Sequence, residues 1–106
     1  MIAGNVLAID FDGVIHDPHD RTPGHKMGMP VDGAHEALTI LHQQGYQLVV
    51  HTCRPAPHVE DWLNYFHIPH ADVTSTKPNA SAYIDDHAIR FVDWPQTLRD
   101  VQRELR

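Results

Sequence analysis

Two aspartates separated by one residue follow an apolar segment near the start of the chain. The segment 6–9 is continuously apolar, and it is followed by Asp10, Phe11, Asp12 and Gly13. Such a run is typical of a strand that is buried on both faces, so Asp10 is expected at the carboxyl end of this strand. Ligands bind at that edge in open parallel sheets. Two carboxylates that converge in a tight loop favour Mg²⁺, which prefers oxygen ligands and retains several waters.

The same pattern also occurs without a metal. A short Asp-x-Asp-Gly segment taken alone is more often an Asx-type turn than a metal site. A second acidic pair, Asp85 and Asp86, again follows an apolar stretch, and adjacent carboxylates at a strand end are costly unless a cation or donors lie beside them. Between the two acidic pairs lie Thr52, after the apolar residues 48–50, and Lys77. We therefore expect four carboxylates, a hydroxyl and an ammonium at or near strand ends, where one crevice can collect them.

The order of these residues resembles the haloacid dehalogenase-like superfamily of phosphohydrolases. The motifs of that superfamily match, in the required order, Asp10–Val14, Thr52, Lys77 and the pair Asp85-Asp86. The resemblance extends over about residues 6–91, and the segment from Lys77 to Phe91 is similar to a small, capless bacterial and phage branch. An arginine usually follows the acidic pair in that branch, whereas His87 follows it here.

The resemblance implies a Mg²⁺-dependent phosphatase that acts on a phosphomonoester. Asp10 would attack phosphorus and form an aspartyl phosphate, and Asp12 would act as general acid and then as general base. Thr52 and Lys77 would bind the phosphate oxygens. Arg54 is a further candidate for phosphate binding, although an exposed loop arginine is an equal alternative.

The same resemblance implies the metal ligands. Mg²⁺ would be held by Asp10, by the backbone carbonyl of Asp12 and by an acid of the second pair. Asp86 is the favoured ligand of that pair. Asp85 would then orient a ligated water or Lys77.

Cysteine and histidine raise two other possibilities, a thiol nucleophile and a histidine metal site, and the sequence favours neither. Cys53 beside Thr52 is expected to be a small packing residue rather than a thiol nucleophile. His16, His19 and His25 occupy one polar segment, and solvated loop imidazoles are expected there rather than a metal site. Of the histidines, His16 and His87 are the candidates to lie near the crevice.

Alternating apolar patterns predict strands and helices in succession. Asp32 is the expected cap of a helix that ends near Gly45, and the last helix is expected to begin near Asp93. Other strands are expected at 47–52, 71–74, 81–85 and 89–92. A short helix is expected with Val59, Trp62, Leu63 and Phe66 on one face. This order predicts an α/β fold: a three-layer, doubly wound, Rossmann-like parallel sheet covered on both faces. Residues 1–106 would form a single domain without a cap, with a flap loop at about 15–30.

Composition limits the function classes. The chain has 42% hydrophobic and 21% charged residues, which is typical of a globular domain. A formal charge of −6 argues against a nucleic-acid-binding surface, and no apolar run has the length of a membrane span. We expect a cytoplasmic protein with a phosphorylated small-molecule substrate, and homo-oligomers are plausible. Two alternatives remain: a catalytically idle binding or assembly protein on the same fold, and a receiver-like phosphoacceptor module, whose motif order fits less well.

Overall fold

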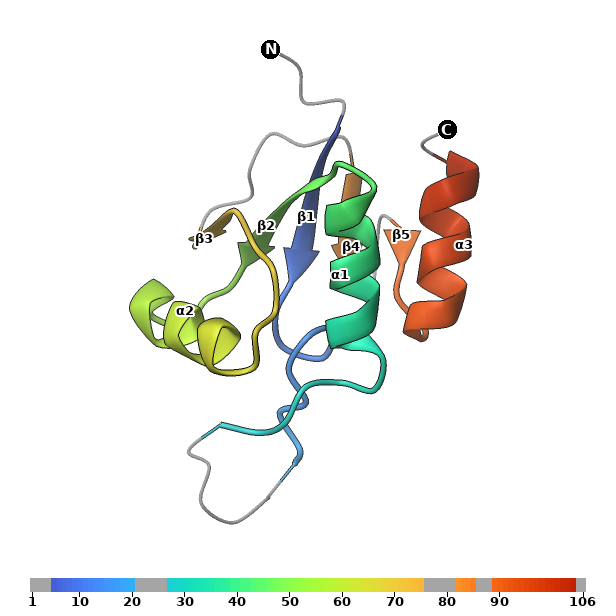
Figure 1. Ribbon diagram of the computed structural model, residues 1–106. Helices are drawn as coiled ribbons and strands as arrows, with labels where there is room; N and C mark the ends of the chain where they lie inside the picture. The colour runs from blue at the N-terminus through green and yellow to red at the C-terminus, as the bar shows by residue number, and fades with distance from the viewer. Residues whose placement is uncertain (1–4, 21–26, 76–81, 86–88, 105–106) are drawn as a thin grey trace.

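The computed structural model describes residues 5–20, 27–75, 82–85 and 89–104 (Figure 1). The strands are β1 (Val6–Asp10), β2 (Gln47–His51), β3 (Asp72–Thr74), β4 (Ala82–Asp85) and β5 (Ile89–Arg90). The helices are α1 (Ala34–Gln43), α2 (Ala56–Tyr65) and α3 (Trp94–Glu104). The predicted succession of strands and helices is therefore confirmed, with boundaries that differ by one or two residues.

The five strands form one sheet in the order β3-β2-β1-β4-β5, and every pair is parallel. β1 is the central strand. Because all strands run in the same direction, their carboxyl ends meet at one edge, which faces the lower loop in Figure 1. The register pairs Asp10, the last residue of β1, with His51, the last residue of β2. The topology thus brings the first acidic segment and the end of β2 together.

One face of the sheet carries the hydrophobic core. Leu7, Ile9, Leu48 and Val50 point into a single buried cluster with residues of all three helices. On the other face, Val49 is half-buried and Gln47 and Asp72 are exposed. The α/β class and the parallel sheet are confirmed. The second helical layer that a three-layer arrangement requires is not present in the part of the chain that the structure describes.

The amino-terminal ends of α3 and α1 test the two predicted helix caps. Asp93 caps α3, because its Oδ1 accepts a hydrogen bond from the backbone N–H of Gln96 at 2.9 Å. The prediction that Asp32 caps α1 is wrong. Gly33 occupies that position with a φ of 83°, and no side chain caps the helix. A left-handed residue directs the chain into α1 there, and glycine adopts that conformation without strain.

Two tryptophans tie the loop between β1 and α1 to the helices. The indole Nε1 of Trp94, in α3, donates to the carbonyl of Val14 at 3.0 Å. The indole Nε1 of Trp62, in α2, donates to the carbonyl of Gly28 at 2.9 Å. Both side chains are buried, so each combines apolar packing with a satisfied polar N–H. The loop beside the sheet edge is therefore held from two sides.

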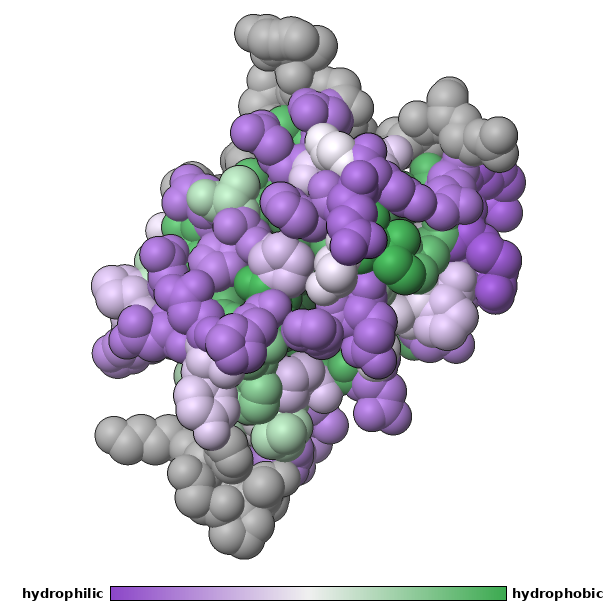
Figure 2. Space-filling view, viewed as in Figure 1, coloured by the Kyte–Doolittle hydropathy of each residue, from purple (hydrophilic) through white to green (hydrophobic). Residues whose placement is uncertain are grey.

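The described surface has no extended apolar area on the face shown in Figure 2, where hydrophilic residues predominate. The large exposed hydrophobic residues are Ile40, Tyr65 and Val92, which belong to three different parts of the chain. None of the helices in the described ranges combines the length and the apolar character needed to cross a membrane.

Candidate active site

A crevice opens at the carboxyl ends of β1 and β2. Its volume is about 170 Å³. The residues that line it are Asp10, Phe11, Asp12, His51, Thr52 and Cys53. The structure thus brings together the two aspartates of the first segment and the threonine that follows β2.

The loop after β1 turns sharply at Phe11. The carbonyl of Phe11 accepts hydrogen bonds from the backbone N–H groups of Ile15 and His16, both at 2.9 Å. Gly13 lies inside this turn with a φ of 83°, a value that favours glycine. The turn brings residues four apart in the sequence together, so that His16 lies beside Asp12.

The carboxylate of Asp12 has several nitrogen partners. Nε of Arg54 donates to Oδ2 at 3.0 Å and to Oδ1 at 3.2 Å, and Nη2 of Arg54 donates to Oδ1 at 3.1 Å. Nδ1 of His16 lies 2.8 Å from the same Oδ1. Partial burial acts to raise the pKa of Asp12, but the hydrogen bonds from Arg54 and His16, together with the Arg54 charge, hold this pKa below its usual value of 3.8. Asp12 is therefore a carboxylate in this arrangement.

His16 lies beside a residue of the crevice, as expected, but its burial was not predicted. Its side chain is 2% exposed, so the expectation of a solvated loop imidazole is wrong for this residue. Its ring stacks on Phe11, with centroids 5.0 Å apart and planes 2° from parallel. The ring of Trp62 lies perpendicular to that of His16, with centroids 5.4 Å apart. His19, by contrast, is exposed as expected, and His25 lies outside the described residues.

His51 is a residue of the crevice that the sequence analysis missed. Its Nδ1 lies 3.2 Å from Oδ1 of Asp10, the proposed nucleophile. The side chains are 20% and 30% exposed, respectively, so both are accessible from the crevice. One feature of the sequence could have indicated His51. Two parallel strands of equal length that pair in register also pair their last residues, and the last residues of β1 and β2 are Asp10 and His51.

Thr52 lies at the bottom of the crevice, where it is 4% exposed. Its backbone N–H donates to the carbonyl of Thr74 at 3.0 Å, and its Oγ1 accepts from the backbone N–H of Arg54 at 3.0 Å. The hydroxyl therefore shapes the turn after β2 and still has its proton to donate. Cys53 is exposed, which corrects the prediction of a buried packing residue.

Arg54 joins the crevice to a second cavity. Its side chain is 40% exposed, as the alternative of an exposed loop arginine requires, and it also forms an ion pair with Asp12. It also lines a cavity of about 320 Å³. The other residues that line this cavity are Met27, Pro55, His58 and Asp61. The two cavities meet at the Asp12–Arg54 pair.

Three residues with expected roles, Lys77, Asp86 and His87, lie outside the described residues. The backbone of Asp85 ends β4, next to the central strand. Within the described ranges there is no cluster of three histidine, cysteine or acidic side chains that could hold a metal ion. The geometry of the expected Mg²⁺ site thus stays a prediction.

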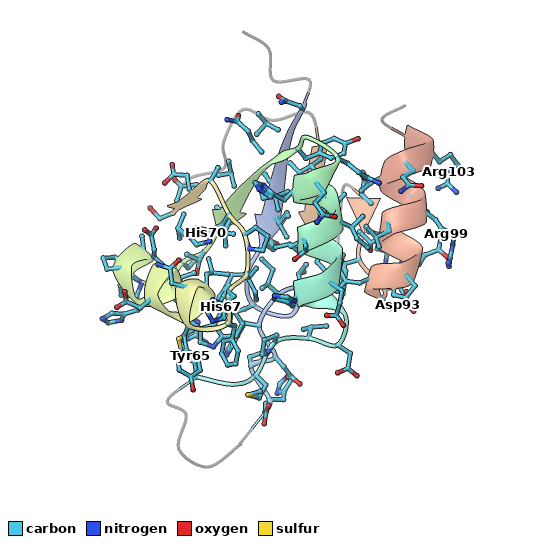
Figure 3. All side chains as sticks on the ribbon, in the orientation of Figure 1. Tyr65, His67, His70, Asp93, Arg99 and Arg103 are labelled. Carbon is cyan, nitrogen blue, oxygen red and sulfur yellow. The ribbon has the colours of Figure 1, made fainter. Side chains whose placement is uncertain are left out.

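Other histidines gather on the segment after α2, where Figure 3 shows His67 and His70. They line a shallow cavity of about 400 Å³ together with His42 of α1. This cavity shares no lining residue with the crevice or with the cavity beside Arg54.

Comparisons with known proteins support the fold. A structure of a conserved protein from Bacteroides thetaiotaomicron is similar, with a TM-score of 0.68 and 18% sequence identity over 93% of this chain and 90% of the other. A crystal structure from Vibrio cholerae has a TM-score of 0.62 and 21% identity over 94% and 98% of the two chains. At these identities the likeness shows the fold alone. No protein-family profile matches the sequence, and no curated protein matches it.

Proposed function

We propose that this chain is a phosphohydrolase of the haloacid dehalogenase-like type, which cleaves a phosphomonoester through an aspartyl phosphate on Asp10. The proposal includes the finer fold that this superfamily implies, a Rossmann-like core without a cap, and a cytoplasmic location. One observation supports it most: Asp10, Asp12 and Thr52 line one crevice at the carboxyl edge of the central parallel strands.

The first step forms the covalent intermediate. A carboxylate oxygen of Asp10 attacks phosphorus, the phosphorus–oxygen bond to the leaving group breaks, and Asp12 gives its proton to the leaving oxygen. The Thr52 hydroxyl donates a hydrogen bond to a phosphoryl oxygen, and Lys77 adds a positive charge there. In the second step Asp12 takes a proton from water, the water oxygen attacks phosphorus, and the bond to Asp10 breaks. The sum of the steps is hydrolysis of the ester to an alcohol and inorganic phosphate.

The free structure holds Asp12 in the state required for the second step. Its lowered pKa makes Asp12 an anion, which is the form that accepts a proton from water. To act as an acid first, Asp12 must bind a proton as the substrate enters. A phosphate dianion beside Asp12 favours this in two ways: it repels the carboxylate, and it competes for Arg54. Arg54 is well placed for that exchange, since Nη1 takes no part in the bridge to Asp12.

The donor set fits Mg²⁺. Asp10 exposes carboxylate oxygens to the crevice, and the backbone carbonyl of Asp12 and the carboxylate of Asp86 are also hard oxygen ligands. When bound, Mg²⁺ would offset the repulsion between the Asp10 carboxylate and the phosphate. Asp86 is the ligand that we propose from the second pair, with Asp85 orienting a ligated water or Lys77.

The cavity beside Arg54 is the space that we assign to the leaving group. It adjoins Asp12, the residue that would protonate the leaving oxygen, and Met27 and Pro55 give it apolar surface. This location supports a phosphorylated small molecule as the substrate.

The test is hydrolysis of 4-nitrophenyl phosphate with and without Mg²⁺ by the wild-type protein and by Asp10→Asn. We expect turnover only with the metal and none from Asp10→Asn, because the amide keeps the shape of the side chain but is not an anionic nucleophile. Asp32→Asn, an exposed aspartate beyond the crevice, is the control and should retain activity. A hydroxylamine-labile phosphoryl group should appear on the wild-type protein during turnover.

Other outcomes identify the alternatives. Equal activity in Asp10→Asn contradicts the covalent mechanism. Absence of hydrolysis together with a long-lived phosphoryl group from acetyl phosphate favours a receiver-like module. Absence of both favours an idle binding protein.

A further inference from the structure

The imidazole of His16 is buried, and contacts with two aromatic rings and at both ring nitrogens restrict its rotation. Phe11 stacks on one face, and the plane of the Trp62 ring lies at 89° to the imidazole, with centroids 5.4 Å apart. Both ring nitrogens have a partner: Nδ1 lies 2.8 Å from Oδ1 of Asp12, and Nε2 lies 2.8 Å from the backbone nitrogen of Gly28. The ring therefore has one orientation and two defined contacts.

The contact with Gly28 determines which nitrogen carries the proton. A backbone N–H can only donate, so Nε2 must accept and must be unprotonated. The neutral imidazole then carries its proton on Nδ1, which donates it to the Asp12 carboxylate. The hydrogen bond that Nε2 accepts from Gly28 thus makes Nδ1 the donor to Asp12.

Gly28 itself is held firmly. Its carbonyl accepts the Trp62 indole N–H at 2.9 Å. A Cβ atom built on Gly28 would lie 2.1 Å from the carbonyl oxygen of Asp17, so the two chain segments approach more closely than any side chain allows. The neighbouring Met29 completes the contact, because its carbonyl accepts the N–H of Asp17 at 2.9 Å. The segment 27–30, which we call the flap arm, is therefore docked against the loop that carries His16.

We propose that His16 is a positioning residue for Asp12 and that the flap arm, through Gly28, fixes the tautomer that this task needs. The proposal rests on the proposed function, because it assigns His16 a part in the acid and base work of Asp12. Arg54 and His16 both hold the carboxylate of Asp12, and Arg54 is the partner that a phosphate can remove. His16 then keeps the carboxylate oriented after Arg54 has moved to the substrate. The orientation of Asp12 depends on the docking of the flap arm in this way.

The tautomer is tested first, and without any substrate. Long-range proton–nitrogen correlation spectra of the ¹⁵N-labelled protein distinguish protonated from unprotonated ring nitrogens. We expect Nδ1 of His16 to be protonated and Nε2 to be unprotonated. A proton on Nε2 would overturn the proposal, whether or not the protein proves to be a phosphatase.

The positioning role is tested with a matched pair of variants. His16→Asn and His16→Gln both remove the aromatic ring, but Asn places an amide near the position of Nδ1, whereas Gln extends toward the position of Nε2. For an alkyl phosphate we expect His16→Gln to lower kcat by about 10- to 100-fold with little change in KM, since misplacing a catalytic group has effects of this size. His16→Asn should recover a large part of this loss. An aryl phosphate, whose leaving group hardly needs a proton, should lose less in its first step.

The results separate the two proposals. Equal losses in both variants for both esters would mean that His16 only packs, and would overturn the positioning role. His19→Gln changes an exposed histidine of the same loop and is the control for general effects. If the wild-type protein hydrolyses no phosphomonoester, the proposed function fails, and the nitrogen spectra still decide the tautomer.

Discussion

Nδ1 of His51 lies 3.2 Å from Oδ1 of Asp10, and the two residues are partners in the parallel register of β2 and β1. The relationship joins the proposed nucleophile to β2, a strand that is paired with β1 on one side and with β3 on the other. A hydrogen bond between them fixes the orientation of the Asp10 carboxylate at the crevice.

The first prediction concerns this contact. His51→Ala should slow phosphorylation of Asp10 by about 2- to 12-fold, the equivalent of one hydrogen bond of about 0.5–1.5 kcal/mol. Single-turnover release of 4-nitrophenol measures that step. His51→Asn keeps a donor near Nδ1 and should lie between the alanine variant and the wild type. An unchanged rate in His51→Ala would mean that the contact has no part in orienting Asp10.

The second prediction concerns the ion pair between Arg54 and Asp12. Arg54→Gln should raise the pKa of Asp12, because it removes hydrogen bonds and a charge that lower this pKa, whereas partial burial, which raises it, remains. The ¹³C shift of the Asp12 carboxyl carbon, followed against pH without metal, measures the change. Arg99→Gln, which replaces an arginine of α3 that bonds to Gln96, is the control and should leave the Asp12 titration unaltered.

The same shift has a consequence for stability, with a definite sign. A carboxyl group whose pKa is lowered in the folded state stabilises that state above its ordinary pKa, and this contribution is lost as the pH falls through the lowered value. Urea unfolding should therefore show wild type more stable than Arg54→Gln at neutral pH. The difference should vanish at pH values below the folded-state pKa of Asp12. Because Asp12 is 41% exposed, salt should also reduce the difference.

The sequence predicted the elements well where the signal was local. The apolar run before Asp10 and the spacing of Ala34, Leu38 and Leu41 reflect burial in a strand and on a helix face. The structure buries the three helix residues and residues 7–9 of the run, and residue 6 is half-buried. Asp93 was predictable as a cap because its bond to Gln96 spans three residues. The Asp32 cap failed because a left-handed Gly33, close to Trp94, starts the helix one residue later.

Three features of the site were not predicted, and they depend on residues distant in the sequence or on where β2 ends: the burial of His16, the contact of His51 and the exposure of Cys53. His16 is buried because Trp62, far along the chain, covers it, and no local pattern indicates that contact. His51 reaches Asp10 only through the parallel register. Cys53 was expected inside, but β2 ends at His51 and the buried position after it belongs to Thr52, so Cys53 faces out.

The third prediction concerns the cavity assigned to the leaving group. Asp61 places one negative charge on the wall of this cavity, and this charge should disfavour leaving groups that are themselves anionic. Asp61→Asn should raise kcat/KM for 4-carboxyphenyl phosphate relative to phenyl phosphate by about two- to fourfold, the size expected for one charge in a solvated setting. High salt should shrink the change. Glu36→Gln removes an exposed charge from α1 and should leave the ratio unaltered. A ratio that Asp61→Asn does not alter would place the leaving group elsewhere.

The fourth prediction compares two glycines. In Gly28→Ala the new Cβ atom would meet the backbone oxygen of Asp17, and the flap arm must shift to relieve the contact. The free energy of unfolding should fall by about 1–3 kcal/mol, as for other overpacked sites. Gly45→Ala is the matched control: it has no atom within 4 Å of the new Cβ, and its cost comes from a φ of 96° alone. Both variants are expected to lose stability, so a measurement at the flap arm itself is needed to distinguish their effects.

The indole N–H signals of Trp62 and Trp94 provide that measurement. Trp62 donates to the carbonyl of Gly28 and Trp94 to that of Val14, so the two signals report on the flap arm and on the turn after β1. In Gly28→Ala the Trp62 signal should move while the Trp94 signal stays, and in Gly45→Ala both should stay. If the Trp62 signal is the same in Gly28→Ala as in the wild type, the close approach of Gly28 to Asp17 does not hold the flap arm, and its docking must depend on other contacts.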